Sequence, residues 1–406
     1  MTSVFAWRYF KSKKSTNAIN IISGISVGAI AISTAALIIV LSVFNGFEGL
    51  VKGLYGDFYA DMRIAPANGK FTTITAAQHN QLKQTANVKG ISYVVEEKAL
   101  LNNESYQSII FLKGVDENYN KVSKLDSHIL RGNFNVGNVQ TPGLVIGLGI
   151  ESAVGANTGL PDAEPLVVYL PNRKAKSLNT TEGLFSESIN VNGSFSIQQE
   201  FDNKYAFTNL AFMQYMLYLQ PNEYSAAELS LTDVGRMDET KKTLQNILGN
   251  NYKVETRYEQ NQSLYRVMQI EKWVIYAILC LILIVAAFNM VGALSMLVLE
   301  KQKDIAVLKA MGSSAQQIKR IFLSTGIVIA GFGAAIGFGL GLLVCFVQQQ
   351  FHFIKLGGGS FVIDYYPVQI HILDFLLVAA TVLVIAVIAS IIPAAKAARQ
   401  QFSLKS

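Results

Sequence analysis

The chain has 406 residues, of which 51% are hydrophobic and 15% are charged. Globular chains carry about 25% charged residues, so this composition indicates a membrane protein. The net charge of +6 does not predict a nucleic-acid partner, because the basic residues gather beside long apolar stretches and not in one patch.

The first of these stretches runs from Ser15 to Phe47 without a charged residue. It exceeds the ~20 apolar residues that cross a bilayer, and it is too long for the apolar region of a signal peptide. We therefore expect a retained transmembrane helix over 21–47. Residues 1–20 mix basic and aromatic side chains, which predicts an amphipathic lead-in at the cytoplasmic surface.

A polar region over 48–270, about 225 residues long, is large enough for a domain of its own. Strand-like and helix-like segments alternate near both of its ends, which predicts two β-α-β halves. Between them, about 115–205, short apolar runs broken by Gly, Pro and Asn favour a β-rich insertion. The expected fold is an α-helical membrane protein with four transmembrane helices and an α+β extracytoplasmic domain.

Three more uncharged stretches follow and predict spans at 273–299, 321–347 and 372–395. Lys and Arg concentrate before the first span, between the second and third, and after the fourth, as in cytoplasmic flanks. The sequence thus predicts that both termini, including the tail 396–406, and the 300–320 linker are cytoplasmic. The 48–270 domain and the short 348–371 loop are then extracytoplasmic.

The 300–320 linker predicts a short amphipathic helix. Asp304 suits the first turn of a helix, where the macrodipole favours negative charge. Ile305, Leu308 and Met311 recur at intervals of three, and Gly312 suits a C-cap. Spacing alone leaves two interpretations open: a helix that meets a partner protein, or a connection that lies on lipid headgroups.

Small residues recur along two of the spans, as in helices whose backbones approach closely. They are Gly24, Gly28, Ala31 and Ala35 in span one and Gly333, Gly337 and Gly341 in span three. For span three, packing within one subunit is the favoured interpretation. The sequence contains no P-loop motif, no nucleophile–base arrangement and no metal-ligand spacing, so we expect a non-catalytic chain that holds no cofactor.

Several motifs resemble one family. Ser42-Val-Phe-Asn-Gly-Phe47 is similar to a signature of lipoprotein-releasing permeases, and the linker resembles the coupling segment of ABC permeases. Residues 266–289 and 393–399 also resemble that family, although its usual Asp-Pro is missing near Arg399. The chain thus resembles lipoprotein-releasing ABC transporter permeases of the LolC/LolE type, in the MacB/FtsX superfamily.

This resemblance implies three groups of site residues. The ATPase-coupling group comprises Glu300, Lys301, Lys303, Asp304, Ile305, Leu308, Met311 and Gly312. The lipoprotein cavity would be lined by Gly28, Ala31, Ala35, Val43, Asn45 and Phe47. A carrier-binding loop would include Arg173, Lys174, Lys176, Leu184 and Phe185, although an ordinary solvated loop is equally compatible with these residues.

The resemblance also implies a function. The permease would extract lipoproteins from the bacterial inner membrane and pass them to a soluble periplasmic carrier. Its partners would be membrane lipids, a second permease subunit (identical or different) and cytoplasmic ABC ATPase subunits that bind ATP and Mg. Two alternatives stay open: MacB-like export of a peptide, toxin or drug, and FtsX-like signalling to cell-wall hydrolases, although FtsX-type outer domains are smaller.

Overall fold

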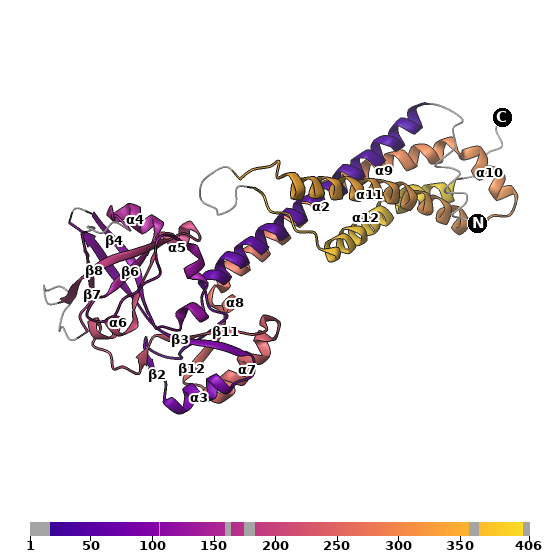
Figure 1. Cartoon of the computed structure of the whole chain (residues 1–406). Coiled ribbons are helices and arrows are strands. Elements are labelled where there is room, and N and C mark those ends of the chain that lie inside the picture. The colour runs from indigo at the N-terminus through magenta and orange to yellow at the C-terminus, as the bar shows by residue number, and fades with distance from the viewer. Residues whose placement is uncertain (1–16, 105, 159–163, 174–182, 357–364, 401–406) are drawn as a thin grey trace. The chain divides into compact units, whose positions relative to one another are not determined.

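The computed structural model describes residues 17–104, 106–158, 164–173, 183–356 and 365–400. The chain divides into two compact units, which we describe separately (Figure 1). Of the described residues, the helical unit contains those of 17–50, 266–356 and 365–400, and the α/β unit contains those of 51–265.

In the described part of the chain, four helices are long and apolar enough to cross a membrane, in agreement with the four expected spans. They are α2 (Asn17–Phe58), α9 (Gln262–Glu300), α11 (Ala315–Phe351) and α12 (Ile372–Arg399). A short helix, α10 (Gln302–Ala310), joins α9 to α11. Helix α2 continues past Phe47, where the sequence predicted the end of the first span, because a helix can extend beyond the apolar segment that crosses the membrane.

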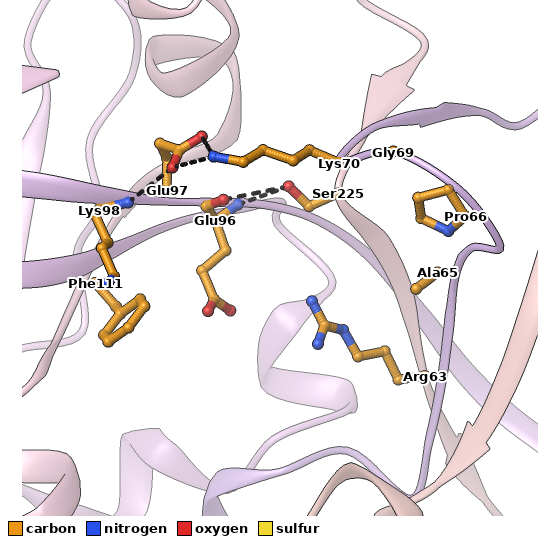
Figure 2. A pocket seen from close by; sticks show the side chains of 10 residues that line it. All are labelled: Arg63, Ala65, Pro66, Gly69, Lys70, Glu96, Glu97, Lys98, Phe111 and Ser225. Atoms are coloured by element: carbon orange, nitrogen blue, oxygen red, sulfur yellow. Dashed lines mark hydrogen bonds and ion pairs between the residues drawn. The ribbon is translucent and has the colours of Figure 1, made fainter. Parts of the chain in front are cut away.

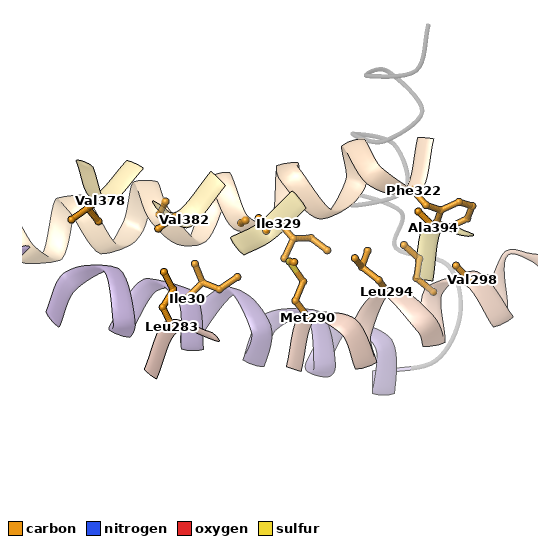
Figure 3. Packing of buried hydrophobic residues seen from close by; sticks show 14 of the residues in the cluster. Ile30, Leu283, Met290, Leu294, Val298, Phe322, Ile329, Val378, Val382 and Ala394 are labelled. Carbon is orange, nitrogen blue, oxygen red and sulfur yellow. The ribbon is translucent and has the colours of Figure 1, made fainter. Parts of the chain in front are cut away.

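One apolar cluster holds the helical unit together (Figure 3). Ile30, Met290, Ile329 and Val382 come from the four different long helices, and all are buried in this cluster. The hydrophobic effect gives no drive for association inside lipid, so contacts of this kind depend on close packing.

Close packing is tightest where three glycines of α11 meet α2. A methyl group on Gly337 would lie 2.5 Å from the carbonyl oxygen of Ala31, and one on Gly333 would lie 2.9 Å from Ile30. On Gly341 it would meet Ile38 at 3.1 Å. The Gly-x-x-x-Gly-x-x-x-Gly face of α11 therefore packs on α2 within this chain, as the sequence favoured.

The α/β unit is built on one large sheet, and among the described residues the order of its strands is β12-β1-β11-β3-β4-β9-β6-β8-β5, with β7 pairing β3 and β8. These strands are β1 (Met62–Pro66), β3 (Val88–Asn103), β4 (Tyr106–Val115), β5 (Ile129–Gly132), β6 (Gly143–Gly147), β7 (Leu166–Pro171), β8 (Leu184–Phe195), β9 (Tyr205–Asn209), β11 (Ala226–Leu231) and β12 (Tyr252–Thr256). A separate small pair joins β2 (Thr72–Thr73) and β10 (Glu223–Tyr224). The helices of this unit are α3 (Ala76–Gln84), α4 (Leu148–Val154), α5 (Gln199–Asp202), α6 (Leu210–Met216), α7 (Met237–Leu248) and α8 (Arg257–Gln260).

The sheet carries two apolar cores. One lies where β1, β11 and β12 meet α3 and α7, and the other involves β4, β6, β7, α4 and α6. Strand β3 is 16 residues long and contributes to both cores. The segment expected as a β-rich insertion therefore shares one continuous sheet with its neighbours, because β3 and β4 extend across both parts.

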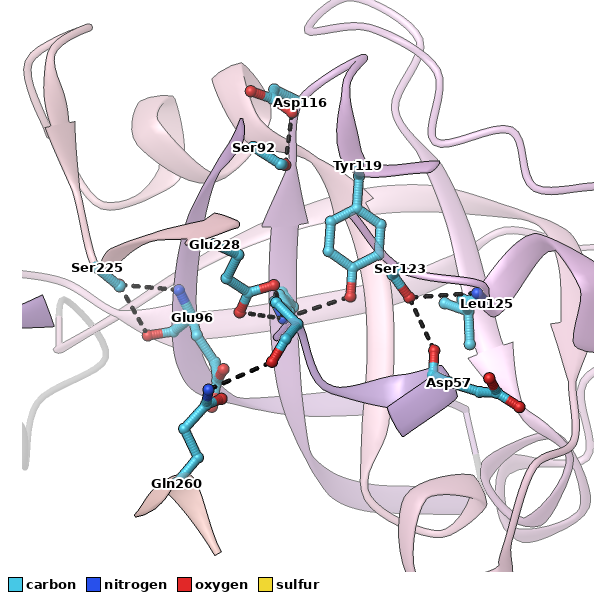
Figure 4. A network of polar contacts seen from close by, with 12 residues as sticks. Asp57, Ser92, Glu96, Asp116, Tyr119, Ser123, Leu125, Ser225, Glu228 and Gln260 are labelled. Carbon is cyan, nitrogen blue, oxygen red and sulfur yellow. Dashed lines mark hydrogen bonds and ion pairs between the residues drawn. The ribbon is translucent and has the colours of Figure 1, made fainter. Parts of the chain in front are cut away.

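A buried charge pair connects β4 and β11 in this sheet (Figure 4). Lys113 Nζ on β4 lies 2.7 Å from Glu228 Oε1 on β11, and both side chains are almost fully buried. Burial opposes the charged form of Lys113, but the attraction from Glu228, Tyr119 and Glu96 together with the hydrogen bond to Glu228 outweighs it and raises the pKa of Lys113. The Lys113 ammonium also donates to the hydroxyl of Tyr119, so its charge is compensated and hydrogen-bonded.

The close contact between α11 and α2 predicts that substitution by alanine lowers stability at one glycine of α11 and not at another. We expect Gly337→Ala to destabilise the protein by about 1–3 kcal/mol, because the added methyl group overpacks against the α2 backbone. Gly339→Ala is the matched control, since nothing lies within 4 Å of its added methyl group. The melting temperatures of both variants are measured in detergent in a Cys280→Ser background. Reaction of the buried Cys345 with a thiol reagent reports unfolding. Equal melting temperatures for the two variants would contradict the contact.

Candidate functional site

Local hydrogen bonds fix the C-terminal end of α10 and its connection to α11. Gly312 adopts φ +88°, and its N–H donates to Lys309 O at 3.0 Å, while the Ser313 N–H donates to Leu308 O at 3.0 Å. These two bonds form a Schellman motif. Ser314 then begins α11 with a capping box that uses Gln317. The segment predicted to couple to an ATPase is thus a short, defined helix between two spans.

The apolar residues of α10 do not share one environment. Ile305 is 2% exposed and packs in the apolar cluster of the long helices, Leu308 is half-buried, and Met311 is 77% exposed. Steps of three residues drift around a helix of 3.6 residues per turn, so the predicted stripe turns from the core towards the surface. Val307, which the sequence analysis did not select, is exposed beside Met311 at i, i+4.

The charged coupling residues lie at the start of α10. Lys301 Nζ is 3.7 Å from a Glu300 carboxylate oxygen and 4.0 Å from one of Asp304, and Lys303 is exposed. Asp304 occupies the first turn, as predicted. The structure therefore brings the predicted coupling residues together on one short segment.

Sequence reasoning missed Lys309. Its ammonium donates to the carbonyl oxygen of Ala398 at 3.2 Å and also to that of Gln400. The last carbonyl groups of a helix have no partner within the helix, and a lysine commonly satisfies them. Lys309 thereby connects α10 to the end of α12. In the sequence, the one sign of this contact is that a basic residue lies near the C-cap Gly312.

The predicted cavity residues of α2 divide into two sets. Ala31 and Ala35 are buried against α11, and Asn45 is buried as well. Gly28, Val43 and Phe47 are partly exposed, and their cavity role stays a prediction. The most open positions of the apolar part of α2 include Ile21, Ile25 and Ile32, the last 71% exposed, which the small-residue pattern did not select.

Asn45 lies at the centre of a polar cluster that joins three helices. Lys272 Nζ of α9 donates to Asn45 Oδ1 at 2.8 Å, and Asn45 Nδ2 donates to Asp374 Oδ2 of α12 at 2.5 Å. Nδ2 also lies 3.4 Å from the carbonyl oxygen of Gln369. The sequence pointed to Asn45 but not to its two charged partners, which are distant along the chain.

The predicted carrier loop connects β7 to β8, which pair antiparallel. The guanidinium of Arg173 lies 4.7 Å from the centre of the Phe71 ring, and Phe185 packs edge-on against Tyr215 and Tyr218. Leu184 is 46% exposed. Lys174 and Lys176 lie outside the described residues.

An open groove of about 470 Å³ lies on the α/β unit (Figure 2). The Arg63 guanidinium and the Glu96 carboxylate point into the same space, and Lys70 pairs with Glu97 at its rim at 2.9 Å. Its described lining contains no nucleophile–base pair, and in the described part of the chain no three His, Cys, Asp or Glu residues gather as metal ligands.

Comparison with known proteins decides the family. Residues 23–247 match the family model "MacB-like periplasmic core domain", and residues 276–402 match "FtsX-like permease C-terminal". The chain is 30% identical to the lipoprotein-releasing system transmembrane protein LolE of Haemophilus influenzae, over 98% of this chain and 96% of that protein. The chain belongs to the family of lipoprotein-releasing system transmembrane proteins.

The chain is also similar to two further proteins over different extents. Lipoprotein-releasing system transmembrane protein LolC of Neisseria meningitidis is 28% identical over 99% of this chain and 98% of that protein. The crystal structure of the periplasmic region of MacB from Actinobacillus actinomycetemcomitans covers 53% of this chain and 98% of its own, at 11% identity and a TM-score of 0.36. Helices α10, α11 and α12 all fall within the stretch that matches the permease model.

Proposed function

We propose that this chain is the membrane subunit of an ABC transporter that extracts lipoproteins from the bacterial inner membrane and delivers them to a soluble periplasmic carrier. The geometry of α10 carries the proposal: the helix is capped at its C-terminal end, anchored to α12 through Lys309, and exposes Val307 and Met311. Full-length similarity to lipoprotein-releasing proteins supports the choice of cargo.

In this proposal, separate cytoplasmic ATPase subunits bind ATP and Mg, and the chain itself catalyses no reaction. The exposed face of α10 docks on the ATPase. Ile305 inserts into the apolar cluster of the long helices, and Lys309 contacts the end of α12. A displacement of α10 is then transmitted to the spans through these two contacts. Ile305 is closely packed, and Lys309 makes charge-assisted hydrogen bonds, so both contacts resist separation.

The cargo explains why ATP is needed. Each lipid CH₂ group that leaves the bilayer costs about 0.8 kcal/mol, so acyl chains resist extraction. We propose that the open face of α2, with Ile25, Gly28 and Ile32 and continuing to Val43 and Phe47, contacts these chains. A second permease subunit, identical or different, would close the cavity from the other side.

The α/β unit is the periplasmic part in this proposal, and both termini and α10 are cytoplasmic, so the chain is a multi-pass inner-membrane protein. The segments β1–α3–β3 and β11–α7–β12 would serve as the two halves of a membrane-proximal body. Strand β1 lies between β11 and β12 in the sheet, which favours movement of the two halves as one body.

Coupling can be tested on the exposed face of α10. We expect Val307→Asp with Met311→Asp to abolish ATPase association while insertion and melting temperature stay normal, because both side chains are exposed and their loss leaves the core intact. Gln316→Asp adds one negative charge nearby, outside the apolar face, and should retain binding. Co-purification of ATPase subunits measures the effect, and full recovery with the double variant would refute docking through this face.

Orientation can be tested by thiol accessibility in a variant without Cys280 and Cys345. We expect Lys242→Cys, on α7, to react with an impermeant maleimide once the outer membrane is permeable, because the α/β unit is periplasmic. Lys303→Cys, on α10, should react only after lysis. Both positions are exposed, so burial does not confound the comparison. Labelling of Lys303→Cys from outside would reverse the proposed topology.

Carrier binding can be tested at the exposed base of the β7–β8 connection. We expect Leu184→Asp to lower recovery of the soluble carrier about tenfold, equivalent to ~1.4 kcal/mol, because it places a charge in an apolar contact. Leu130→Asp on β5 is the matched control, since Leu130 is also an exposed strand leucine. A carrier pull-down with purified complexes distinguishes them, and equal recovery would return this connection to the role of a plain loop.

A further inference from the structure

Residues 366–369, between α11 and α12, have no regular secondary structure and lie against one face of α2. We call this segment the strap. Ser42, Gly46 and Gly49 recur at intervals of four and three residues, so they share that face of the helix. A methyl group on Gly46 would overlap the backbone of Pro367, and one on Gly49 would lie 2.9 Å from a side-chain oxygen of the strap. The two glycines therefore form a seat for the strap.

Hydrogen bonds fix the strap to α2. The Gln369 N–H donates to Ser42 O at 2.9 Å, and a carbonyl oxygen within a helix has a second lone pair for such a bond. The Gln369 carbonyl oxygen lies 3.4 Å from Asn45 Nδ2, which also donates to Asp374 in the first turn of α12. Both of these contacts of Gln369 are made by its backbone, so they depend on the position of the strap and not on the side chain.

The strap is also fixed to the last turn of α11. Gln349 Nε2 donates to Val368 O at 2.8 Å, and Gln348 Nε2 donates to Tyr366 O at 3.2 Å. The Tyr366 N–H donates to Ile354 O at 3.1 Å. The proline that separates Tyr366 from Val368 has no N–H, and its ring fixes φ, so the strap is stiff at this point.

These contacts join three helices at one place. A segment that only connected two spans would run over the surface and bond its backbone to water. The strap bonds instead to α2 and α11, and it leads into α12, which begins at Ile372. Helix α2 leaves the helical unit at Leu50, about one helical turn after Gly46, and continues to Phe58. The strap thus holds α2 close to the point where that helix enters the α/β unit.

We propose that the strap is a coupling element that makes α2 follow a displacement of α11 and α12, with Gly46 as the positioning residue that lets it seat. The inference rests on the proposed function for the source of the displacement, which is the ATPase acting through α10. Lys309 connects α10 to the end of α12, and the strap connects the start of α12 to α2. Motion that begins at one end of α12 therefore reaches α2 at the other end.

The first test measures whether the strap holds α2, and it requires no cargo and no nucleotide. Nitroxide labels are attached at Gly53→Cys on α2 and Leu373→Cys on α12, both exposed, in the full-length chain without its two native cysteines. Pulsed electron resonance in nanodiscs gives the distribution of distances between the labels. We expect a narrow distribution in the parent protein and a broader one in Gly46→Ala. Gly331→Ala on α11 is the matched control and should stay narrow, because nothing lies within 4 Å of its added methyl group.

The second test measures coupling in the complex with its native partners. We expect Gly46→Ala to raise the number of ATP molecules hydrolysed per lipoprotein released about tenfold, because overpacking at the seat displaces the strap. A loss of folded protein lowers hydrolysis and release together and leaves this ratio unchanged, so the ratio separates coupling from stability. Gly331→Ala should keep the ratio of the parent complex.

A narrow distance distribution in Gly46→Ala, or an unchanged ratio, would overturn the proposal. If the parent complex releases no lipoprotein, the proposed function fails, and the label distances still decide the role of the strap. If Gly46→Ala does not fold, Gln349→Leu takes its place, since it removes the bond to Val368 O from an exposed position. Gln349→Leu should broaden the distribution and raise the ratio about threefold, and no change in either would contradict the strap.

Discussion

The contact between the glycine face of α11 and the backbone of α2 is the constraint on which the helical unit depends. Inside a bilayer, apolar side chains gain nothing by leaving lipid, so helices associate through packing and polar contacts. Gly333 and Gly337 let α11 approach α2 so closely that a methyl group on either would need a backbone or β-carbon shift. That proximity fixes the rotation of α2: Ala31 and Ala35 face inward, and Ile25 and Ile32 face outward.

The same close packing makes the long helices a rigid body that α10 contacts. Ile305 inserts into the cluster that α2, α9, α11 and α12 share, and Lys309 fastens the helix to the last carbonyl groups of α12. The Schellman motif at Gly312 and the capping box at Ser314 leave little slack between α10 and α11. In the proposed mechanism, movement of α10 would therefore be passed to at least two spans, while Val307 and Met311 stay exposed.

Features encoded by neighbouring residues were predictable, and features that depend on distant partners were not. The four spans and both caps of the α10–α11 connection follow from local composition and short motifs. The rotation of α2 could not be predicted in this way, because a small residue permits close approach but does not identify the helix that approaches. The contact of Lys309 was missed because its acceptors lie about ninety residues away along the chain. The continuity of the sheet was missed because β3 pairs with β4, β7 and β11, which are also separated in sequence.

Each unit contains charged side chains that a partner holds in place. In the sheet, Lys113 and Glu228 pair directly, and Tyr119 takes a further hydrogen bond, so this charge pair is closed. In the helical unit, the amide of Asn45 accepts from Lys272 and donates to Asp374. An ammonium only donates and a carboxylate only accepts, so an amide can bridge the two charges without a direct ion pair. One side chain of α2 thereby joins a cation of α9 to an anion of α12, and three helices are connected through two hydrogen bonds.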